Sequence, residues 1–465
     1  MKISVVGLGK LGAPMCAVLA SVGYQVIGVD LDQTKVNAIN AHRAPVNEPR
    51  LEDFINTFGT NIEGTTDLEY AVKNSDVSFI VVLTPSQKDG TFSLKYILPA
   101  CQNIGRALGT KNEYHVVVIT STIMPGHTTE ITKELEHISG KKAGVDFGVC
   151  YSPEFIALGS VIENMQQPDM VLIGTDHKMA GIVLEEIYKK VVINSPKFAI
   201  MKPVEAELTK IAINTFITTK ITYANMLADF CECLPGANVD VVTAAVGMDS
   251  RIGNKYLKGG VSFGGPCFPR DNVALKSLGD SLDIDVAVPQ EVHNSNERRV
   301  EMLTKWIKGT AVGKKVAIIG LTYKIGSEVI EEAAGWKIMN ALSDWYVDLS
   351  IYDPVYKGTL PIGVRRVTNL HECIEKANLI LVMLPYPEVI ELDETVWDRT
   401  PEQRSSGKYS GSARIVIDCW RVLLKLAKHD DTVVKYLPIG IGGEYEQYSS
   451  NWSGRFHRPS FNQTT

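Results

Sequence analysis

The sequence predicts an α/β protein with two Rossmann-like doubly wound domains, joined by a long central helix and a helical dimerisation region. Three observations support this fold class. Short apolar, β-rich runs alternate with helical stretches in the first 200 residues and again beyond residue 314, as parallel doubly wound sheets require. Residues 204–233 contain neither proline nor glycine, which predicts one uninterrupted helix. With 465 residues, the chain exceeds the ~250–300 residues at which one hydrophobic core stops growing.

These observations divide the chain into four parts. We expect a dinucleotide-binding domain at 1–200, a central helical region at 201–298, a second nucleotide-binding domain at 299–441 and a polar tail at 442–465. Within the second domain, residues 401–411 form a polar loop insertion. The tail contains scattered aromatic residues and is expected either to dock on the surface or to be disordered.

The composition excludes several classes of protein. The net charge of −6 is modest and no long basic or acidic block occurs, so neither nucleic acid nor a membrane surface is an expected partner. No run of about 18 apolar residues is present, and the first residues enter a strand at once instead of forming a signal peptide. Eight cysteines without metal-type spacing indicate free thiols in a reducing cytoplasm and no metal site.

The N-terminus has the pattern of a dinucleotide-binding unit. A strand at Lys2–Val6 is followed by Gly7-Leu-Gly9-Lys-Leu-Gly12 and a helical stretch. Gly7 allows a tight turn, Gly9 lets a pyrophosphate approach the backbone, and Gly12 lets the helix pack closely on the strand. The N-terminus of that helix offers free N–H groups and a positive dipole to the phosphates.

The next strand, Gln25–Val29, ends in an acidic residue at the spacing that the dinucleotide motif requires. Asp30 lies about 20 residues beyond the glycines, where it can hydrogen-bond the adenosine ribose. Its charge would repel a 2′-phosphate. We therefore expect NAD, rather than NADP, as the cofactor.

Further strands are predicted at Val77–Leu83, His115–Thr120 and Phe147–Tyr151, with helices near Leu94–Leu108 and His127–Ile138. Their carboxyl ends carry the segments Thr84-Pro85, Ser121-Thr122 and Ser152-Pro153-Glu154. Each segment could be an ordinary cap or turn. Together they fall at the edge of the sheet where ligands of doubly wound proteins bind.

The predicted central helix, Val204–Cys233, is about 45 Å long, so it outreaches one domain. We expect it to bridge two domains and to pack against its copy in a homodimer or larger homo-oligomer. Its charged residues exclude a membrane span. Lys210 and Asn214 are four residues apart and share a face. Taken alone, they are read more simply as a solvated lysine beside an asparagine.

The stretch Gly259–Asp271, GGVSFGGPCFPRD, surrounds one thiol with turn-forming residues. Glycine lets the backbone or a substrate approach closely and proline stiffens the loop. Both features are typical of a loop that presents a nucleophile. The alternative is a tight turn in which Cys267 is a small buried apolar residue. Asp271 likewise has two readings, as a catalytic group or as the N-cap of a helix at Val273–Leu278.

A second alternating α/β unit follows. Its predicted elements are a strand at Lys315–Ile319, a helix at Glu331–Leu342, and strands at Val347–Tyr352, Leu379–Leu384 and Ile415–Asp418. The first strand leads into Gly320-Leu-Thr-Tyr-Lys324, and one glycine cannot form a dinucleotide fingerprint. A different nucleotide ligand is therefore expected here.

The cysteine loop resembles the GGSCFPKD active-site motif of the UDP-glucose/GDP-mannose dehydrogenase family. Other segments resemble that family's TP, STxxPGT, NPEF, ELxKxxxNxF, DxRIG, GxxFK and DGR motifs. The resemblance extends from about residue 1 to 425. It implies an NAD-dependent enzyme that oxidises C6 of a nucleotide sugar twice, through a cysteine thiohemiacetal and thioester.

The resemblance also implies roles for individual residues. The catalytic residues would be Cys267, Lys210, Asn214, Asp271, Glu154 and Thr122. NAD would be bound by Gly7, Gly9, Leu11, Gly12, Asp30, Lys35, Thr84, Ser121, Thr122 and Arg270. The nucleotide sugar would contact Glu154, Phe155, Lys210, Asn214, Arg251, Tyr256, Gly264, Tyr323, Lys324 and Arg421, with Arg251 reaching the site of a neighbouring subunit.

The sequence departs from the family pattern at several positions. Pro266 replaces a serine, Arg270 a lysine and Leu158 a glutamate, and the arginine expected after the GLTYK segment is absent. Arg421 lies one position later than the family's DGR arginine. UDP-glucose is the expected substrate, with UDP-N-acetylhexosamine and GDP-mannose as alternatives. A two-electron hydroxyacid-type dehydrogenase and a non-catalytic nucleotide-sugar-binding protein are the other readings.

Overall fold

The computed structural model describes residues 1–311, 313–345, 347–398, 413–429 and 433–442. The chain forms two compact units. Unit 1 is Met1–Ile213 with Ser277–Ile284, and unit 2 is Asn214–Lys276 with Asp285–Thr465. The predicted polar loop at 401–411, and the predicted tail beyond Gly442, lie outside the described residues.

Residues 1–213, all of which the structure describes, contain an eight-stranded sheet of order β3-β2-β1-β4-β5-β6-β7-β8. Its pairs are parallel except for β6 with β7, which is antiparallel. The strands are β1 Lys2–Val6, β2 Gln25–Val29, β3 Ile62–Thr65, β4 Val77–Ile80, β5 His115–Ile119, β6 Phe147–Tyr151, β7 Met170–Gly174 and β8 Lys197–Met201.

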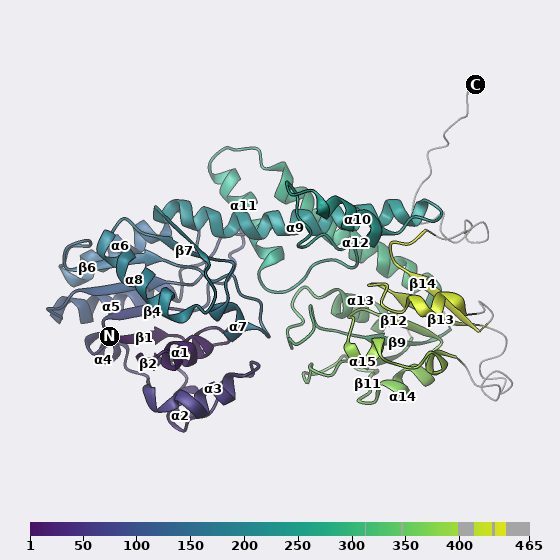
Figure 1. Cartoon of the computed structure of the whole chain (residues 1–465), viewed down its shortest axis with the longest axis horizontal. Coiled ribbons are helices and arrows are strands. Elements are labelled where there is room, and N and C mark those ends of the chain that lie inside the picture. Colours follow the sequence, from purple (N-terminus) through teal and green to yellow (C-terminus); the bar gives the residue numbers. More distant parts are fainter. Residues whose placement is uncertain (312, 346, 399–412, 430–432, 443–465) are drawn as a thin grey trace. The chain divides into compact units, whose positions relative to one another are not determined.

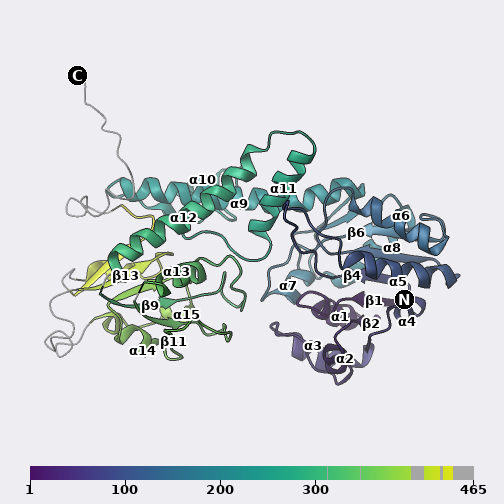
Figure 2. The same ribbon diagram turned by 180° about the vertical axis from the view of Figure 1, so that it is seen from behind.

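Helices cover both faces of this sheet (Figures 1 and 2). The helices of this region are α1 Gly12–Ser21, α2 Gln33–Asn40, α3 Leu51–Phe58, α4 Leu68–Lys73, α5 Ile97–Thr110, α6 His127–Ser139, α7 Val161–Gln166 and α8 Lys178–Val191. Alternate residues of β5 face opposite layers, as strand geometry requires. Val116 and Val118 pack with α1, α3, α7 and α8, whereas Val117 and Ile119 pack with α5 and α6.

Four helices make up the central region: α9 Pro203–Cys233, α10 Val239–Met248, α11 Phe268–Ser281 and α12 Ala287–Ala311. Helix α9 matches the predicted long helix to within one residue. Helix α11 begins at Phe268, with a proline in its first turn where the missing N–H is tolerated. Asp271 therefore lies inside the first turn, and its predicted role as N-cap is wrong. Helix α12 runs continuously across the predicted boundary at 298/299.

The described part of residues 315–438 contains a six-stranded parallel sheet of order β11-β10-β9-β12-β13-β14. Its strands are β9 Lys315–Ile319, β10 Asp348–Tyr352, β11 Val364–Arg366, β12 Leu379–Val382, β13 Arg414–Asp418 and β14 Val434–Pro438. The helices are α13 Ala334–Ser343, α14 Leu370–Glu375 and α15 Pro387–Ile390. One face packs on α12 and α13 and the other on α14 and α15. The predicted fold class, with two Rossmann-like sheets, is thereby confirmed.

The segment that follows β14 pairs with the turn between α9 and α10. The amide of Val239 donates to the carbonyl of Gly440 at 2.9 Å, and that of Gly236 donates to Gly442 at 3.0 Å. In return, the amide of Gly442 donates to the carbonyl of Ala237 at 2.9 Å. Backbone hydrogen bonds thus join the last described residues of unit 2 to its central helices.

Within the described ranges, no helix has the length and apolar character needed to cross a membrane.

Candidate active site

The glycine loop between β1 and α1 has the geometry that a dinucleotide requires. Gly7 has φ +106°, and a Cβ atom there would lie 2.4 Å from the carbonyl oxygen of Val81. A Cβ atom on Gly12 would lie 1.8 Å from the carbonyl oxygen of Gly7, so neither position accepts a side chain. At Gly9, by contrast, no atom lies within 4 Å of the Cβ position. A pyrophosphate could therefore approach this backbone, as NAD binding requires.

Asp30 follows β2 and is tied to the glycine loop. Its Oδ2 accepts a hydrogen bond from the amide of Leu8 at 2.8 Å and lies 3.1 Å from Nζ of Lys35. Its Oδ1 accepts from the amide of Asp32 at 2.9 Å. Leu11 precedes the first residue of α1 and is partly buried. The structure thus brings together the predicted ribose ligand, Lys35 and the loop that would hold the phosphates.

The carboxyl ends of β4 and β5 are joined by the hydroxyl of Ser121. Its Oγ donates to the carbonyl of Val82 at 2.6 Å and accepts from the amide of Val82 at 3.0 Å. Thr122 follows directly, and Thr84 is buried two residues beyond Val82. The predicted cofactor residues of these two strands therefore lie at one edge of the sheet.

A residue that sequence reasoning missed, Glu207 of α9, fixes the loop that contains Thr122. Its carboxylate accepts hydrogen bonds from the amides of Gly126 and Thr128, at 2.6 and 2.7 Å, and from the Thr128 hydroxyl at 2.6 Å. Burial raises the pKa of Glu207, and these hydrogen bonds oppose that shift. The sequence did contain a signal that could have revealed Glu207, because it is the first residue of the ELTK segment that includes Lys210. Its carboxylate caps α6 from a helix that also carries Lys210.

Glu154 lies beyond β6 against an apolar pocket whose lining includes Met15, Phe79 and Val191. Burial raises the pKa of Glu154 to about 7, and the Tyr188 hydroxyl and the Lys210 charge partly oppose this. Tyr188 donates to Oε1 of Glu154 at 3.1 Å. A carboxyl group poised near neutrality is suited to exchange a proton with water.

Tyr188, on α8, is a second residue that the sequence did not reveal. Its hydroxyl lies 3.0 Å from Oγ of Ser152, so one tyrosine connects Ser152 to the carboxyl of Glu154. A tyrosine at helical spacing among apolar residues is usually part of the core, and no local pattern indicated otherwise.

Lys210 is held against the backbone that carries Glu154. Its Nζ donates to the carbonyl oxygen of Glu154 at 2.8 Å and lies 4.4 Å from the centre of the Phe155 ring. The predicted residues Glu154, Phe155 and Lys210 are therefore in contact. The ammonium group is oriented by a backbone carbonyl and an aromatic face.

In unit 2, Cys267 directly precedes α11, and its carbonyl accepts from the amide of Asp271 at 2.9 Å. The N-terminus of a helix favours negative charge on a group placed there. The carboxyl of Asp271 is 1% exposed and accepts a hydrogen bond from the side-chain amide of Asn214 at 2.6 Å. Nε of Arg270 lies 3.7 Å from its other oxygen.

All eight cysteines lie in the described ranges, and two of them, Cys233 and Cys267, are exposed. Burial raises the pKa of Cys101, Cys150 and Cys419 to about 12, which makes these thiols poor nucleophiles. Cys267 itself is exposed, so the expectation that it is a small buried apolar residue is wrong.

The glycines of the cysteine loop are in close contact with the segment after β9. Gly265 has φ +87° and donates from its amide to the carbonyl of Glu331 at 2.9 Å. A Cβ atom there would lie 2.7 Å from the Tyr323 ring, and one on Gly264 would lie 2.4 Å from the carbonyl oxygen of Glu332. The predicted substrate residues Gly264 and Tyr323 therefore border the same loop, and Lys324 follows Tyr323.

The remaining predicted substrate residues, Tyr256, Arg251 and Arg421, have different surroundings. Tyr256 is half-exposed, with its ring 6.4 Å from that of Phe268. Arg251 is 86% exposed and pairs with Asp249, two residues away. The Arg421 side chain is fully buried and hydrogen-bonded to Asp240 and to the backbone carbonyls of Gly259 and Ile439. This burial gives no support to the expected contact between Arg421 and the substrate.

The fold and these sites define a class of protein, a dinucleotide-dependent oxidoreductase with an exposed thiol and a second Rossmann-like domain. Comparison with family models gives the same answer for three consecutive segments. Residues 1–192 match the NAD binding domain, 204–298 the central domain and 317–424 the UDP binding domain of the UDP-glucose/GDP-mannose dehydrogenase family. The chain belongs to this family, and its cofactor is NAD.

Individual relatives are also nucleotide-sugar dehydrogenases. A GDP-mannose 6-dehydrogenase of Pseudomonas putida is 36% identical over 359 residues, which cover 76% of this chain and 81% of the relative. A UDP-glucose 6-dehydrogenase of Haloferax volcanii is 31% identical over 404 residues, 85% of this chain and 93% of the relative.

Among solved structures, a UDP-glucose dehydrogenase of Pyrobaculum islandicum superposes with a TM-score of 0.83 at 28% identity, covering 95% of this chain and 98% of that one. A UDP-D-ManNAc dehydrogenase of Pyrococcus horikoshii gives 0.79 at 25% identity, with coverage of 95% and 100%. The predicted family and cofactor are confirmed, and the protein is a member of a family of NAD-dependent nucleotide-sugar dehydrogenases.

Proposed function

We propose that this protein oxidises the C6 hydroxymethyl group of UDP-glucose to a carboxylate, giving UDP-glucuronate. Two hydrides leave the same carbon, and NAD, when bound, accepts each hydride. One water supplies the second carboxylate oxygen. The observation that carries the proposal is the exposed thiol of Cys267 at the start of α11, one helical turn before the buried carboxyl of Asp271.

Cys267 acts after the first oxidation has produced an aldehyde. Its sulfur adds to the carbonyl carbon and forms a thiohemiacetal, which the second oxidation converts into a thioester. Water then cleaves the carbon–sulfur bond, releasing the carboxylate and regenerating the thiol. A thiolate suits both stages because it is a good nucleophile and a good leaving group.

The other predicted catalytic residues manage charge and protons. Lys210 and the Asn214 amide donate hydrogen bonds to the oxygen on C6, where loss of one such donor typically lowers the rate ~10²–10³-fold. Asp271, Glu154 and Thr122 orient the hydrolytic water and exchange protons with it.

The choice of UDP-glucose rests on two kinds of support. The match to a UDP binding domain at 317–424 favours a uridine nucleotide, and the Pyrobaculum structure carries UDP-glucose dehydrogenase in its name. The second candidate is GDP-mannose, favoured by the 36% identity to the Pseudomonas enzyme. A UDP-N-acetylhexosamine is the third, since the Pyrococcus structure belongs to a UDP-D-ManNAc dehydrogenase.

The protein is also proposed to act as a homodimer. Along α9, the side chains of Phe216, Tyr223, Met226 and Phe230 are exposed. The spacing of seven between residues 216, 223 and 230 places these rings on one stripe of the helix. Exposed apolar stripes of this kind mark protein contacts. A Phe230→Glu variant that sediments as a monomer, beside a dimeric wild type, would support this contact, whereas an unchanged mass would refute it.

The decisive experiment measures NADH formed per nucleotide sugar consumed with UDP-glucose, UDP-galactose, UDP-N-acetylhexosamines and GDP-mannose. Two NADH per UDP-glucose, with lower kcat/KM for the others, is the expected result. Two NADH with a different sugar would replace the substrate and keep the mechanism. One NADH would favour a two-electron dehydrogenase and remove the covalent role of Cys267, and none would favour a nucleotide-sugar-binding protein.

A further inference from the structure

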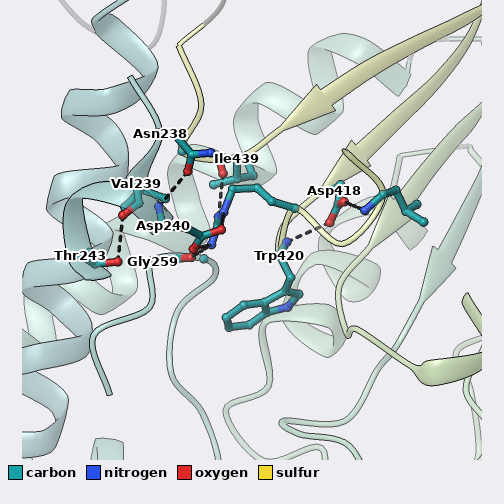
Figure 3. A network of polar contacts seen from close by, with 12 residues as sticks. Asn238, Val239, Asp240, Thr243, Gly259, Asp418, Trp420 and Ile439 are labelled. Atoms are coloured by element: carbon teal, nitrogen blue, oxygen red, sulfur yellow. Dashed lines mark hydrogen bonds and ion pairs between the residues drawn. The ribbon is translucent and has the colours of Figure 1, made fainter. Parts of the chain in front are cut away.

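A single buried arginine, Arg421, connects three segments of unit 2 that are distant in sequence. Figure 3 shows that the residues it joins, Asp240, Gly259 and Ile439, lie close together. Arg421 lies three residues beyond β13 and has φ +59°, a conformation that non-glycine residues seldom adopt. Its side chain is 0% exposed. Asp418 stabilises the turn, accepting hydrogen bonds from the amides of Trp420 at 3.0 Å and Leu423 at 2.8 Å. A strained backbone conformation that its surroundings hold in place is common at functional sites.

The guanidinium group of Arg421 donates to acceptors on each of the three segments. Nε and Nη2 bind the two carboxylate oxygens of Asp240, on α10, at 2.7 and 2.8 Å. Nη2 also donates to the carbonyl of Gly259 at 2.7 Å, and Nη1 to the carbonyl of Ile439 at 2.7 Å. Gly259 is the first residue of the cysteine loop, and Ile439 directly follows β14. The bidentate pairing with Asp240 fixes the plane of the guanidinium.

Trp420, the neighbour of Arg421, packs against Gly260, the second residue of the cysteine loop. Its ring would lie 2.7 Å from a Cβ atom on Gly260, and its indole N–H donates to the carbonyl of Met383 at 2.8 Å. Gly260 is also held by Arg299, which donates to its carbonyl at 2.6 Å, and by Asn225, which accepts from its amide at 2.8 Å. Side chains from α9, from α12 and from the turn after β13 therefore converge on Gly260.

Further hydrogen bonds hold the loop between Gly260 and the thiol of Cys267. Asn225 donates to the carbonyl of Val261 at 3.1 Å, and Asn296 of α12 exchanges two hydrogen bonds with the backbone of Phe263, at 2.8 and 2.9 Å. With the bond from Gly265 to Glu331, side chains or backbone groups hold the loop at five positions within the eight residues before Cys267. The path of the backbone up to the nucleophile is thus set by its neighbours.

We propose that Arg421 is a positioning residue for Cys267. By holding Gly259 next to Asp240 and Ile439, it fixes the position of the loop that ends at the thiol. It also connects that loop to the end of β13 in the nucleotide-binding sheet. This inference rests on the proposed function, because it takes Cys267 as the nucleophile. It replaces direct substrate contact, the role first expected for Arg421.

The test compares Arg421→Lys and Asp240→Asn with a matched control, Arg414→Lys. Arg414 is also a buried arginine at β13, but its guanidinium binds carbonyls outside the cysteine loop, among them those of Glu375, Ala377 and Trp397. Measured quantities are kcat, KM for NAD and for the nucleotide sugar, Tm, and the rates at which iodoacetamide alkylates Cys267 and Cys233, followed by peptide mass spectrometry. The alkylation assay needs no substrate.

Both test variants should lower kcat by ~10–100-fold, because small displacements of a reacting group have effects of that size. The KM values should change by less than about threefold, a much smaller effect on binding than on turnover. The alkylation rate of Cys267, but not of Cys233, should change severalfold, and Arg414→Lys should change neither kcat nor alkylation even where it lowers Tm equally.

Three outcomes would overturn the inference. Equal losses in Arg421→Lys and Arg414→Lys would reduce Arg421 to a structural role. A raised KM for the nucleotide sugar, with normal alkylation and kcat, would return it to substrate binding. Unchanged Cys267 alkylation in both test variants would remove the link to the loop. A wild type that forms no NADH would refute the proposed function separately, since the alkylation comparison would still report on the loop.

Discussion

The side-chain amide of Asn214 donates a 2.6 Å hydrogen bond to Oδ2 of Asp271, so a residue of α9 directly orients a carboxyl group in the first turn of α11. An amide nitrogen carries two hydrogens. One is used by Asp271, and the other can serve a substrate oxygen. The two residues therefore form one unit, in which the carboxyl orients the amide and the amide satisfies a buried carboxyl.

This pairing predicts strongly non-additive effects. Asn214→Ala should lower kcat ~10²–10³-fold, as loss of an oxyanion donor does. It should also destabilise the fold by about 1–3 kcal/mol, because a buried acceptor loses its donor. Asp271→Ala should do the same to kcat, and the double variant should be little worse than either. Urea unfolding and steady-state kinetics of the three variants measure the coupling, and additive losses would contradict it.

Replacement of the proposed nucleophile gives a second prediction. Cys267→Ser should retain the first oxidation but fail to sustain turnover, because a serine ester is hydrolysed far less readily than a thioester. Cys233→Ser, at the other exposed thiol, is the control and should leave two NADH per sugar. Rapid-quench analysis should show a stalled aldehyde or ester in Cys267→Ser. Sustained release of two NADH by this variant would exclude the covalent mechanism.

The raised pKa of Glu154 predicts the pH dependence of hydrolysis. Burial raises this pKa to about 7, so the carboxylate needed to accept a proton from water forms only as the pH rises through about 7. The rate should therefore fall on the acid side of that value. In Glu154→Gln this acidic limb should disappear together with most of the activity, which single-turnover measurements across pH would reveal.

Tyr188→Phe refines that prediction, because the hydroxyl of Tyr188 favours the charged form of Glu154. Its removal should raise the pKa and move the acidic limb to higher pH. Tyr24→Phe, at a buried tyrosine stacked under Lys190, provides the control and should leave the profile in place. A shift to lower pH in Tyr188→Phe would refute the proposed relation.

Asp30 offers a test of cofactor choice. Asp30→Asn keeps an acceptor for the amide of Leu8 but removes the negative charge. We expect KM for NAD to rise by at least about tenfold and the preference for NAD over NADP to fall, since a hydrogen bond to a charged group contributes ~1.5–3 kcal/mol and ~1.4 kcal/mol is a factor of ten. Asp32→Ala is the control, because Asp32 accepts from Thr34 and caps α2. Equal effects in the two variants would contradict the assignment.

Strands with a long apolar run that ends at a turn-forming residue could be predicted from the sequence with little error. Phe147–Tyr151 and Lys315–Ile319 have the predicted bounds, because their residues fill a sheet covered on both faces. Helix α12 was not predicted, since Pro289 stands near its start and polar residues such as Asn296 interrupt its apolar face. The edge strand β11 was also missed, because its sequence Val-Arg-Arg lacks an apolar run.

The residues of the candidate site were predictable where a local pattern marks them. Gly7, Gly9 and Asp30 follow a spacing rule, whereas the partners of catalytic groups do not. Tyr188 is 34 residues from Glu154, and Asn214 is 57 residues from Asp271, so only the folded chain shows that they meet. Arg421 illustrates the same limit. A charged residue after a strand is usually solvated, and its burial depends on acceptors up to 181 residues away.

The pairing of the last described residues with the turn between α9 and α10 affects the order in which the protein can be completed. Gly236 and Val239 are synthesised about 200 residues before Gly440 and Gly442, their hydrogen-bonding partners. Unit 1 can obtain almost all of its chain early in translation, but the hydrogen bonds that close the turn between α9 and α10 can form only after residue 442 has been synthesised. A chain that ends before residue 439 would thus contain almost all of unit 1, but the turn between α9 and α10 would lack its hydrogen-bonding partners, which favours misassembly.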